Sequence, residues 1–254
     1  MKSFNSLLAA AAFLLILTAP CVATEDGAGR AEKILDYVDD LYRSSSSHGV
    51  ITMKIVTEHW SRELKLEEWS MGEDFTLLRI LAPKKEKGTA TLRRKNEIWN
   101  YLPKVNRVIK LPSSMMSDSW MGSHFTNDDL VKETRMTEDY DFEITSTGKR
   151  VGAAIIKITC HPHADAAVVW GKVLVVVRAE NHIPIEIEYF DEDLELARTM
   201  EFKNVMQLGG RRIPSTMIVT PADKPGEHTE VIYNEIEFNV DLDESLFSLR
   251  NLKK

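Results

Sequence analysis

Cysteine is scarce in this chain: its 254 residues include only two, Cys21 and Cys160, so at most one internal disulfide could form. Cys21 lies at the end of an apolar N-terminal stretch, so cleavage beyond it would leave Cys160 alone and exclude an internal disulfide. After residue 23 the sequence also lacks an apolar run long enough to span a bilayer. The core must therefore stabilise the fold by itself.

Motifs of catalysis and metal binding are missing as well. The chain has no glycine-rich phosphate loop, CxxC pair, HExxH motif or GxSxG elbow. Ser119 and His124 lie near Asp118 but lack the strand-turn-helix context of a hydrolase nucleophile. Two histidines flank Pro162 without a third ligand at a telling spacing, which is more typical of a loop than of a metal site. We expect no enzyme and no cofactor.

Positive charge is in deficit, since 39 acidic residues outnumber 32 basic ones and the formal net charge is −7. This balance argues against a nucleic-acid partner and against general attraction to anionic lipid. One basic cluster departs from it, and we interpret it as a surface for an acidic partner or a phosphate headgroup: Arg93, Arg94, Lys104 and Arg107, with Lys95 and Lys110. The alternative is a solvated face of two edge strands, which basic residues protect from self-pairing.

The N-terminus has the pattern of a secretory signal peptide. Lys2 precedes an apolar run from Leu7 to Leu17, and small residues follow at 21–23. We expect cleavage after Ala23, which leaves residues 24–254 as one domain in the periplasm of a Gram-negative cell. Lipidation of Cys21 is the alternative, and Pro20 before it fits that reaction poorly.

The remaining sequence predicts one helix followed by a long antiparallel meander. Residues 31–42 place Ile34, Leu35, Val38 and Leu41 on one helical stripe. Period-two alternation then begins near Met53 and continues almost to the end, with turn signals between short segments. The predicted strands include 53–57, 63–67, 74–81, 89–95, 97–102, 105–111, 139–146, 151–160, 167–179, 184–190, 196–206, 213–220 and 229–239.

Some of these strands are apolar on both faces, which an antiparallel sheet with one wet face would not be. Residues 77–81 and 173–177 are two cases. We expect helices or a bound ligand to cover both sides, as in a curled sheet wrapped around the N-terminal helix. A plain β-sandwich is the alternative. The segment 241–252 predicts a last helical turn that docks onto the end of the sheet.

An oily, flexible segment interrupts the meander at residues 113–135. Large apolar side chains alternate there with Ser, Asp, Gly and Asn, and a short helix is predicted to begin at Thr126 or Asn127. We interpret this segment as a lid over a cavity, because methionine and aromatic side chains repack around different ligands. The alternative is a surface loop folded onto its own Trp120 and Phe125.

Four stretches resemble the LolA/LolB-like outer-membrane lipoprotein-sorting family, in its larger branch: residues 88–112, 113–130, 180–205 and 211–221. The resemblance implies an incomplete antiparallel β-barrel of about eleven strands, mainly β, closed by helices. It also implies a monomeric periplasmic carrier, or chaperone, that shields the acyl chains of a lipoprotein or lipid. An inner-membrane exporter of ABC or resistance-nodulation-division type would supply the cargo for outer-membrane biogenesis. His124 stands where such relatives carry an acid.

Candidate lining residues follow from the apolar positions of the strands and the lid. Trp99 and Tyr101 share one side of a strand, where they could hold a headgroup or belong to the core. The full set is Met53, Ile55, Leu64, Leu66, Leu77, Trp99, Tyr101, Met115, Met116, Trp120, Met121, Phe125, Trp170, Met200, Phe202 and Met217. A one-residue slip in register would invert each strand's contribution. An envelope lipid sensor or assembly module that regulates a membrane partner is the alternative function.

Overall fold

The computed structural model describes residues 27–254 except 117, 128, 130–134 and 167. The expected signal peptide, residues 1–23, lies outside the described residues, as does part of the expected lid. Within the described part of the chain, no helix is both long and apolar enough to cross a membrane.

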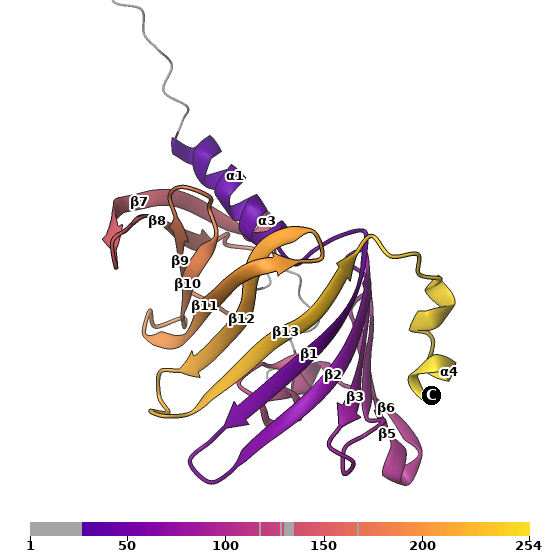
Figure 1. The fold of residues 1–254 in the computed structure, drawn as a ribbon. Coiled ribbons are helices and arrows are strands. Elements are labelled where there is room, and N and C mark those ends of the chain that lie inside the picture. Colours follow the sequence, from indigo (N-terminus) through magenta and orange to yellow (C-terminus); the bar gives the residue numbers. More distant parts are fainter. Residues whose placement is uncertain (1–26, 117, 128, 130–134, 167) are drawn as a thin grey trace, which may run out of the picture.

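A single curled sheet of thirteen antiparallel strands dominates the molecule (Figure 1). Its order is β6-β5-β4-β3-β2-β1-β13-β12-β11-β10-β9-β8-β7. This is the incomplete barrel that the family resemblance implies, with thirteen strands in place of about eleven. The strands are β1 (Ser46–Val56), β2 (Ser61–Met71), β3 (Phe75–Ala82), β4 (Ala90–Arg94), β5 (Glu97–Leu102), β6 (Arg107–Lys110), β7 (Tyr140–Arg150), β8 (Ala153–Pro162), β9 (Lys172–Arg178), β10 (Pro184–Phe190), β11 (Leu196–Leu208), β12 (Arg211–Pro221) and β13 (His228–Phe238).

The order has one long-range junction, because β1 pairs with β13 in the middle of the sheet. Every other pairing joins consecutive strands. The strands predicted at 139–146 and 151–160 place a turn at Thr147 and Gly148, and that turn was wrong. Strand β7 runs on to Arg150, and the chain reverses at Val151 and Gly152, both with positive φ.

Helix α1 (Gly27–Asp40) covers one half of the inner, concave face of the sheet (Figure 1). Ala31, Ile34, Leu35 and Val38 are buried in one cluster with the inward residues of β8, β9 and β10. The helix ends two residues before the predicted end. Leu41 instead packs with Ile213 and Ile236 in a separate cluster.

The strands with two apolar faces are covered on both sides. On β3, Leu78 and Ile80 face inward and pack with Trp120 of the lid segment. Leu77 faces outward and packs with Phe247 and Leu252. These last two belong to η4 (Glu244–Phe247) and α4 (Leu249–Leu252), which lie on the outer face of β3–β5 rather than at the end of the sheet.

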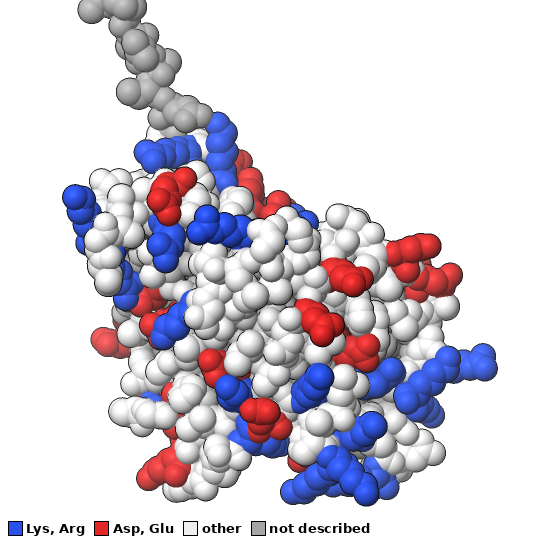
Figure 2. Space-filling view, viewed as in Figure 1, with Lys and Arg blue, Asp and Glu red and all other residues white. Residues whose placement is uncertain are grey.

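Charged side chains of both signs are scattered over the face shown in Figure 2. Lys and Arg gather along its lower edge, below the lower ends of β1–β3. Four further helices with bounds in the described part of the chain are short: η1 (Pro103–Val105), η2 (Ser113–Met115), η3 (Trp120–Gly122) and α3 (Met136–Asp139).

Candidate functional site

The lid segment, here residues 118–127, covers the inner face of β1–β3. Trp120 is 3% exposed and packs against the inward residues Ile51, Met53, Leu64 and Leu66, with Met121 and Phe125 beside it. The indole Nε1 of Trp120 donates to Thr91 Oγ1 at 3.1 Å. A large aromatic ring therefore occupies this part of the concave face and satisfies its own polar atom.

Polar contacts attach the lid segment to the strands on either side of β1, which are β2 and β13. Arg62 on β2 donates to the carbonyl oxygen of Met121. On the other side, the His124 amide donates to Thr229 Oγ1 at 3.0 Å, and His124 Nε2 lies 3.2 Å from a Glu227 carboxylate oxygen. His124 therefore anchors the lid segment to β13 and to the β12–β13 turn.

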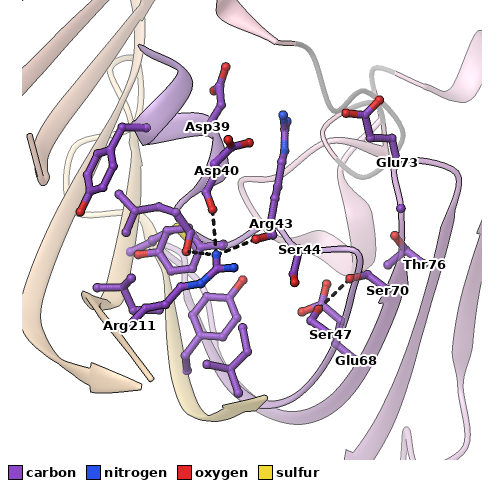
Figure 3. A pocket seen from close by; sticks show the side chains of 18 of the residues that line it. Asp39, Asp40, Arg43, Ser44, Ser47, Glu68, Ser70, Glu73, Thr76 and Arg211 are labelled. Carbon is purple, nitrogen blue, oxygen red and sulfur yellow. Dashed lines mark hydrogen bonds between the residues drawn. The ribbon is translucent and has the colours of Figure 1, made fainter. Parts of the chain in front are cut away.

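An upper compartment of about 930 Å³ opens where α1 ends above β1, β2 and β12 (Figure 3). Its rim is polar, with Asp39, Asp40 and Glu73 of one sign and Arg43 and Arg135 of the other. Its floor is apolar, with Met217, Tyr233 and Ile236. The volume is within the range of about 300–1,000 Å³ typical of small-molecule sites.

Arg211 of β12 fixes the edge of this compartment. Its guanidinium donates to the carbonyl oxygens of Asp40 and Arg43 at 3.0 and 2.6 Å, and to that of Leu41 (Figure 3). These groups lie at the C-terminal end of α1, where the helix dipole favours a cation. The mouth therefore has a rigid side, built by α1 and β12.

An inner compartment of about 290 Å³ continues from the upper one, since Asp39, Tyr42, Asp129 and Met217 line both. Most of its lining is apolar or aromatic, and Asp39, Asp129 and Arg198 are the charged residues among it. The lining includes Val38, Phe125, Met136, Tyr140, Val168, Trp170, Val173, Ile187, Tyr189, Met200 and Phe202.

A lower compartment of about 290 Å³ lies on the far side of Phe125, Trp170 and Arg198, which line both it and the inner one. The β1–β2 and β12–β13 turns bound it through Thr57 and Lys224. Three adjoining compartments thus follow the inner face of the sheet from one end toward the other.

Arg198 and Asp129 form a buried ion pair between the inner and lower compartments. The two N–H···O contacts measure 2.7 and 2.8 Å, and Arg198 is 7% exposed. Its guanidinium carbon lies 4.6 Å from the ring centroids of both Trp170 and Tyr189. The sequence interpretation did not include this pair, although an arginine in a strand beside Met200 and Phe202 was a usable signal.

The same carboxylate closes a reciprocal cap at the end of the lid segment. Thr126 N donates to Asp129 Oδ2 at 2.8 Å, and Asp129 N donates to Thr126 Oγ1 at 3.1 Å. This is the capping-box arrangement, and Thr126 rather than Asn127 is the capping residue. Burial opposes ionisation of Asp129, but its hydrogen bonds from Arg198 and Thr126 hold its pKa below the ordinary value.

Asp39 lines both the upper and the inner compartments, and its pKa is shifted upward, opposite to that of Asp129. Burial raises the pKa of Asp39 to about 6, against the hydrogen bond from the Met136 amide and the charges of Arg43 and Arg135. The boundary between the two compartments therefore carries one carboxyl group that titrates near neutral pH.

The predicted lining residues fall into three groups. Phe125, Trp170, Met200, Phe202 and Met217 line the inner compartment together. Met53, Ile55, Leu64 and Leu66 lie on the inner face beneath Trp120 and Met121. The structure does not bring the others to the cavity: Leu77, Trp99 and Tyr101 pack with the C-terminal segment on the outer face, and Met115 is exposed beside Met116.

The predicted partner-binding residues are also separated. Arg93 is buried and Arg94 is exposed at the end of β4 next to the β4–β5 turn. Lys104 and Arg107 are exposed in the β5–β6 turn, at the opposite end of these strands. The basic residues therefore do not form one surface, because the β-strands carry them to opposite ends of the sheet.

Comparisons with known proteins give a consistent fold. A family model described as "-like: Uncharacterized protein" matches residues 72–254, well over half of the chain. No curated protein matches the sequence. Among solved structures, a DUF1329 family protein from Desulfovibrio piger is similar with a TM-score of 0.79 at 19% identity, covering 89% of this chain and 99% of that one.

Two further solved structures carry descriptive names. A LolA superfamily protein from Nitrosomonas europaea has a TM-score of 0.71 at 22% identity, covering 87% of this chain and 98% of its own. A putative outer membrane lipoprotein-sorting protein domain from Vibrio parahaemolyticus has a TM-score of 0.74 at 24% identity, covering 89% and 100%. At these identities the likeness shows the fold, which all three share over nearly their full length.

Proposed function

We propose, on the premise that this chain belongs to the LolA-like family, that it is a periplasmic carrier which shields acyl chains of a lipid or lipoprotein in transit to the outer membrane. The observation that carries the proposal is the apolar inner compartment joined to a polar mouth. Acyl chains would enter the inner compartment, and the headgroup or peptide would stay at the polar mouth. The role is binding rather than catalysis.

The energetics of such a carrier come from burial alone. Each methylene removed from water contributes about 0.8 kcal/mol, so ten methylenes contribute about 8 kcal/mol. The inner compartment offers Met200, Met217 and several aromatic rings as lining, and flexible methionine side chains adapt to chains of different shape. A lining of this kind binds acyl groups without selecting a single one.

The lid segment would govern access to a larger apolar surface. Trp120 and its neighbours cover Met53, Ile55, Leu64 and Leu66, which are apolar enough to receive a second chain once the lid moves. The Arg198–Asp129 pair and the His124 contacts hold the lid segment closed. We propose that cargo enters as these contacts open, with an inner-membrane exporter as donor.

Native mass spectrometry of the protein purified from its cells tests the carrier proposal. The expected result is a mass excess that fits a diacyl lipid or lipoprotein and that disappears on delipidation. The delipidated protein should then take up a fluorescent fatty acid. If native and delipidated protein have the same mass and neither takes up the probe, the proposal fails.

A pair of methionine variants on β11 locates the probe. Met200 lines the inner compartment, whereas Met206 on the same strand is 48% exposed. Met200→Glu places a charge among apolar groups and should weaken uptake at least about tenfold, because it removes favourable burial and adds a desolvation cost. Met206→Glu should leave uptake unchanged. Equal effects of the two changes would place the probe elsewhere.

A further inference from the structure

The turns at one end of β1–β6 form a continuous rim. Alternate turns of an antiparallel meander lie at the same end of a sheet. Here these are the β1–β2 turn (57–60), the β3–β4 loop (83–89) and the β5–β6 turn with its flanks (102–107), all at the lower end in Figure 1. We call these three segments the lower rim.

The three segments are adjacent in space. Trp60 and Lys85 line one surface depression together with Pro83. A Cβ atom on Gly88 would lie 3.7 Å from Pro103 Cγ, so the second and third segments are in contact. The lower rim is therefore one surface rather than three separate loops.

Its charge is opposite to that of the whole chain. The lower rim carries five exposed cations, Lys84, Lys85, Lys87, Lys104 and Arg107, and two acids, Glu58 and Glu86. Glu86 is itself 4.0 Å from Arg62. Figure 2 shows Lys and Arg gathered at this edge, in a chain whose net charge is −7.

Apolar side chains are exposed among these cations. Trp60 is 43% exposed, Leu102 37% and Val105 59%. Val105 lies between Lys104 and Asn106 in the β5–β6 turn, where nothing in the sheet requires a large aliphatic group. Cations around exposed apolar groups, with a tryptophan at the edge, are the combination that the interface of an anionic bilayer binds.

The lower rim also adjoins the site. A Cβ atom on Gly122 would lie 3.6 Å from the Trp60 ring, so the rim touches the lid segment. Thr57 of the rim lines the lower compartment, which shares Phe125, Trp170 and Arg198 with the inner one. A partner bound to the lower rim would therefore lie next to the lid segment and the lower compartment.

We propose that the lower rim docks this protein onto the surface of a bilayer that contains anionic phospholipid. Val105, Leu102 and Trp60 enter the headgroup region while the lysine side chains lie among the phosphates. The docking itself is independent of the cavity's contents. Only its purpose, the exchange of cargo beside the lid, rests on the proposed function.

Vesicle flotation of the purified protein tests the docking. The probes are vesicles of phosphatidylcholine with about one quarter phosphatidylglycerol, and vesicles of phosphatidylcholine alone. Wild-type protein should float with the anionic vesicles only, and less so as salt is raised. The triple change Lys84→Gln, Lys85→Gln and Lys104→Gln should weaken partitioning about 100-fold, since each cation near the surface contributes about fivefold.

Matched controls separate the rim from overall charge. Lys149, Lys203 and Lys254 are exposed elsewhere, and changing all three to Gln removes the same charge without the rim. For the apolar part, Val105→Asp should weaken flotation, whereas Val151→Asp, at a fully exposed valine, should not. Unchanged thermal unfolding and unchanged fatty-acid uptake establish that each variant is folded.

Three results would overturn the docking: no preference for anionic vesicles, flotation of the rim variants like wild type, or an equal loss in the controls. The first would leave an acidic protein as the partner of this surface. The carrier proposal fails separately, through the loss of lipid and fatty-acid binding. A protein that takes up the fatty acid but ignores vesicles contradicts the docking alone, and the reverse contradicts the carrier alone.

Discussion

Arg198 is buried between the inner and lower compartments and was not among the residues identified from the sequence. Its guanidinium is bidentate to Asp129 and packs against the adjacent rings of Trp170 and Tyr189. Its charge is therefore satisfied only while the Asp129 carboxylate, which caps the end of the lid segment, stays in place. Removing one partner of such a pair leaves the other buried and uncompensated, which is far more costly than losing an exposed pair.

Replacing Arg198 should therefore strongly lower the free energy of unfolding. A second, more exposed ion pair supplies the control. Arg198→Met should lower the free energy of unfolding by about 3–5 kcal/mol. Arg150 also makes a bidentate pair, with Glu186, but its side chain is 42% exposed. Arg150→Met should cost less than about 1 kcal/mol. Urea unfolding monitored by tryptophan fluorescence measures both, and similar losses would contradict this account.

Asp39 predicts a pH dependence of stability. Its folded pKa, about 6, lies above the ordinary carboxyl value, so the stability it contributes is present below that ordinary value and is lost as pH rises to about 6. Asp39→Asn should flatten this dependence and raise the free energy of unfolding at neutral pH by up to about 3 kcal/mol. Denaturation at about pH 5 and about pH 7.5 compares the two proteins. A wild-type profile that rises over this interval would refute the assignment.

Asp129 contributes to stability with the opposite pH dependence. Its pKa is held below the ordinary value, so its contribution to stability is present near neutral pH and is lost as pH falls through the folded pKa. Acid should thus release the lid contact under conditions in which Asp39 is neutral. Neither shift could be read from the sequence, since burial and partners come from residues far along the chain.

The positions of the strands could be predicted well from the sequence, whereas the side chains that line the cavity could not. Segment 97–102 is predicted and observed with the same ends, because its turn signals are local. Which face each side chain takes depends on pairing with distant strands. Leu77 and Leu78 differ by one position, and the first packs under Phe247 while the second packs under Trp120. The sequence alone predicts neither the strand register nor which segment packs over each face of the sheet.

The lid segment should be the element that opens most easily. Trp120→Ala removes a buried indole and its bond to Thr91, which should cost about 3–5 kcal/mol of lid attachment. Because loss of the lid need not unfold the sheet, limited proteolysis should cut near residues 113–135 faster, with a smaller change in global stability. Tyr37→Ala, at a 40% exposed aromatic residue on α1, is the control. Equal cutting rates would show that Trp120 does not hold the lid.

At the scale of the whole molecule, bound lipid should stabilise the fold. A ligand that binds only the folded state at 100 times its dissociation constant adds about 2.7 kcal/mol. For a chain of this size that corresponds to a rise in Tm of roughly 5–10 °C. Delipidated protein should melt earlier, and added fatty acid should restore the Tm in wild type but not in Met200→Glu. A Tm independent of lipid would contradict occupancy of the inner compartment.

The pairing of β1 with β13 has an effect on how the polypeptide matures. Ser47 lies opposite Phe238, so strands from the two ends of the sequence share one ladder at the centre of the sheet. A chain that emerges N-terminus first must leave β1 with an open edge until almost everything else has been made, and closing so long a loop is slow. An open edge is a template for pairing with other chains. The interval before the last strand arrives is thus when newly made protein is most vulnerable to aggregation, and when an assisting chaperone would matter most.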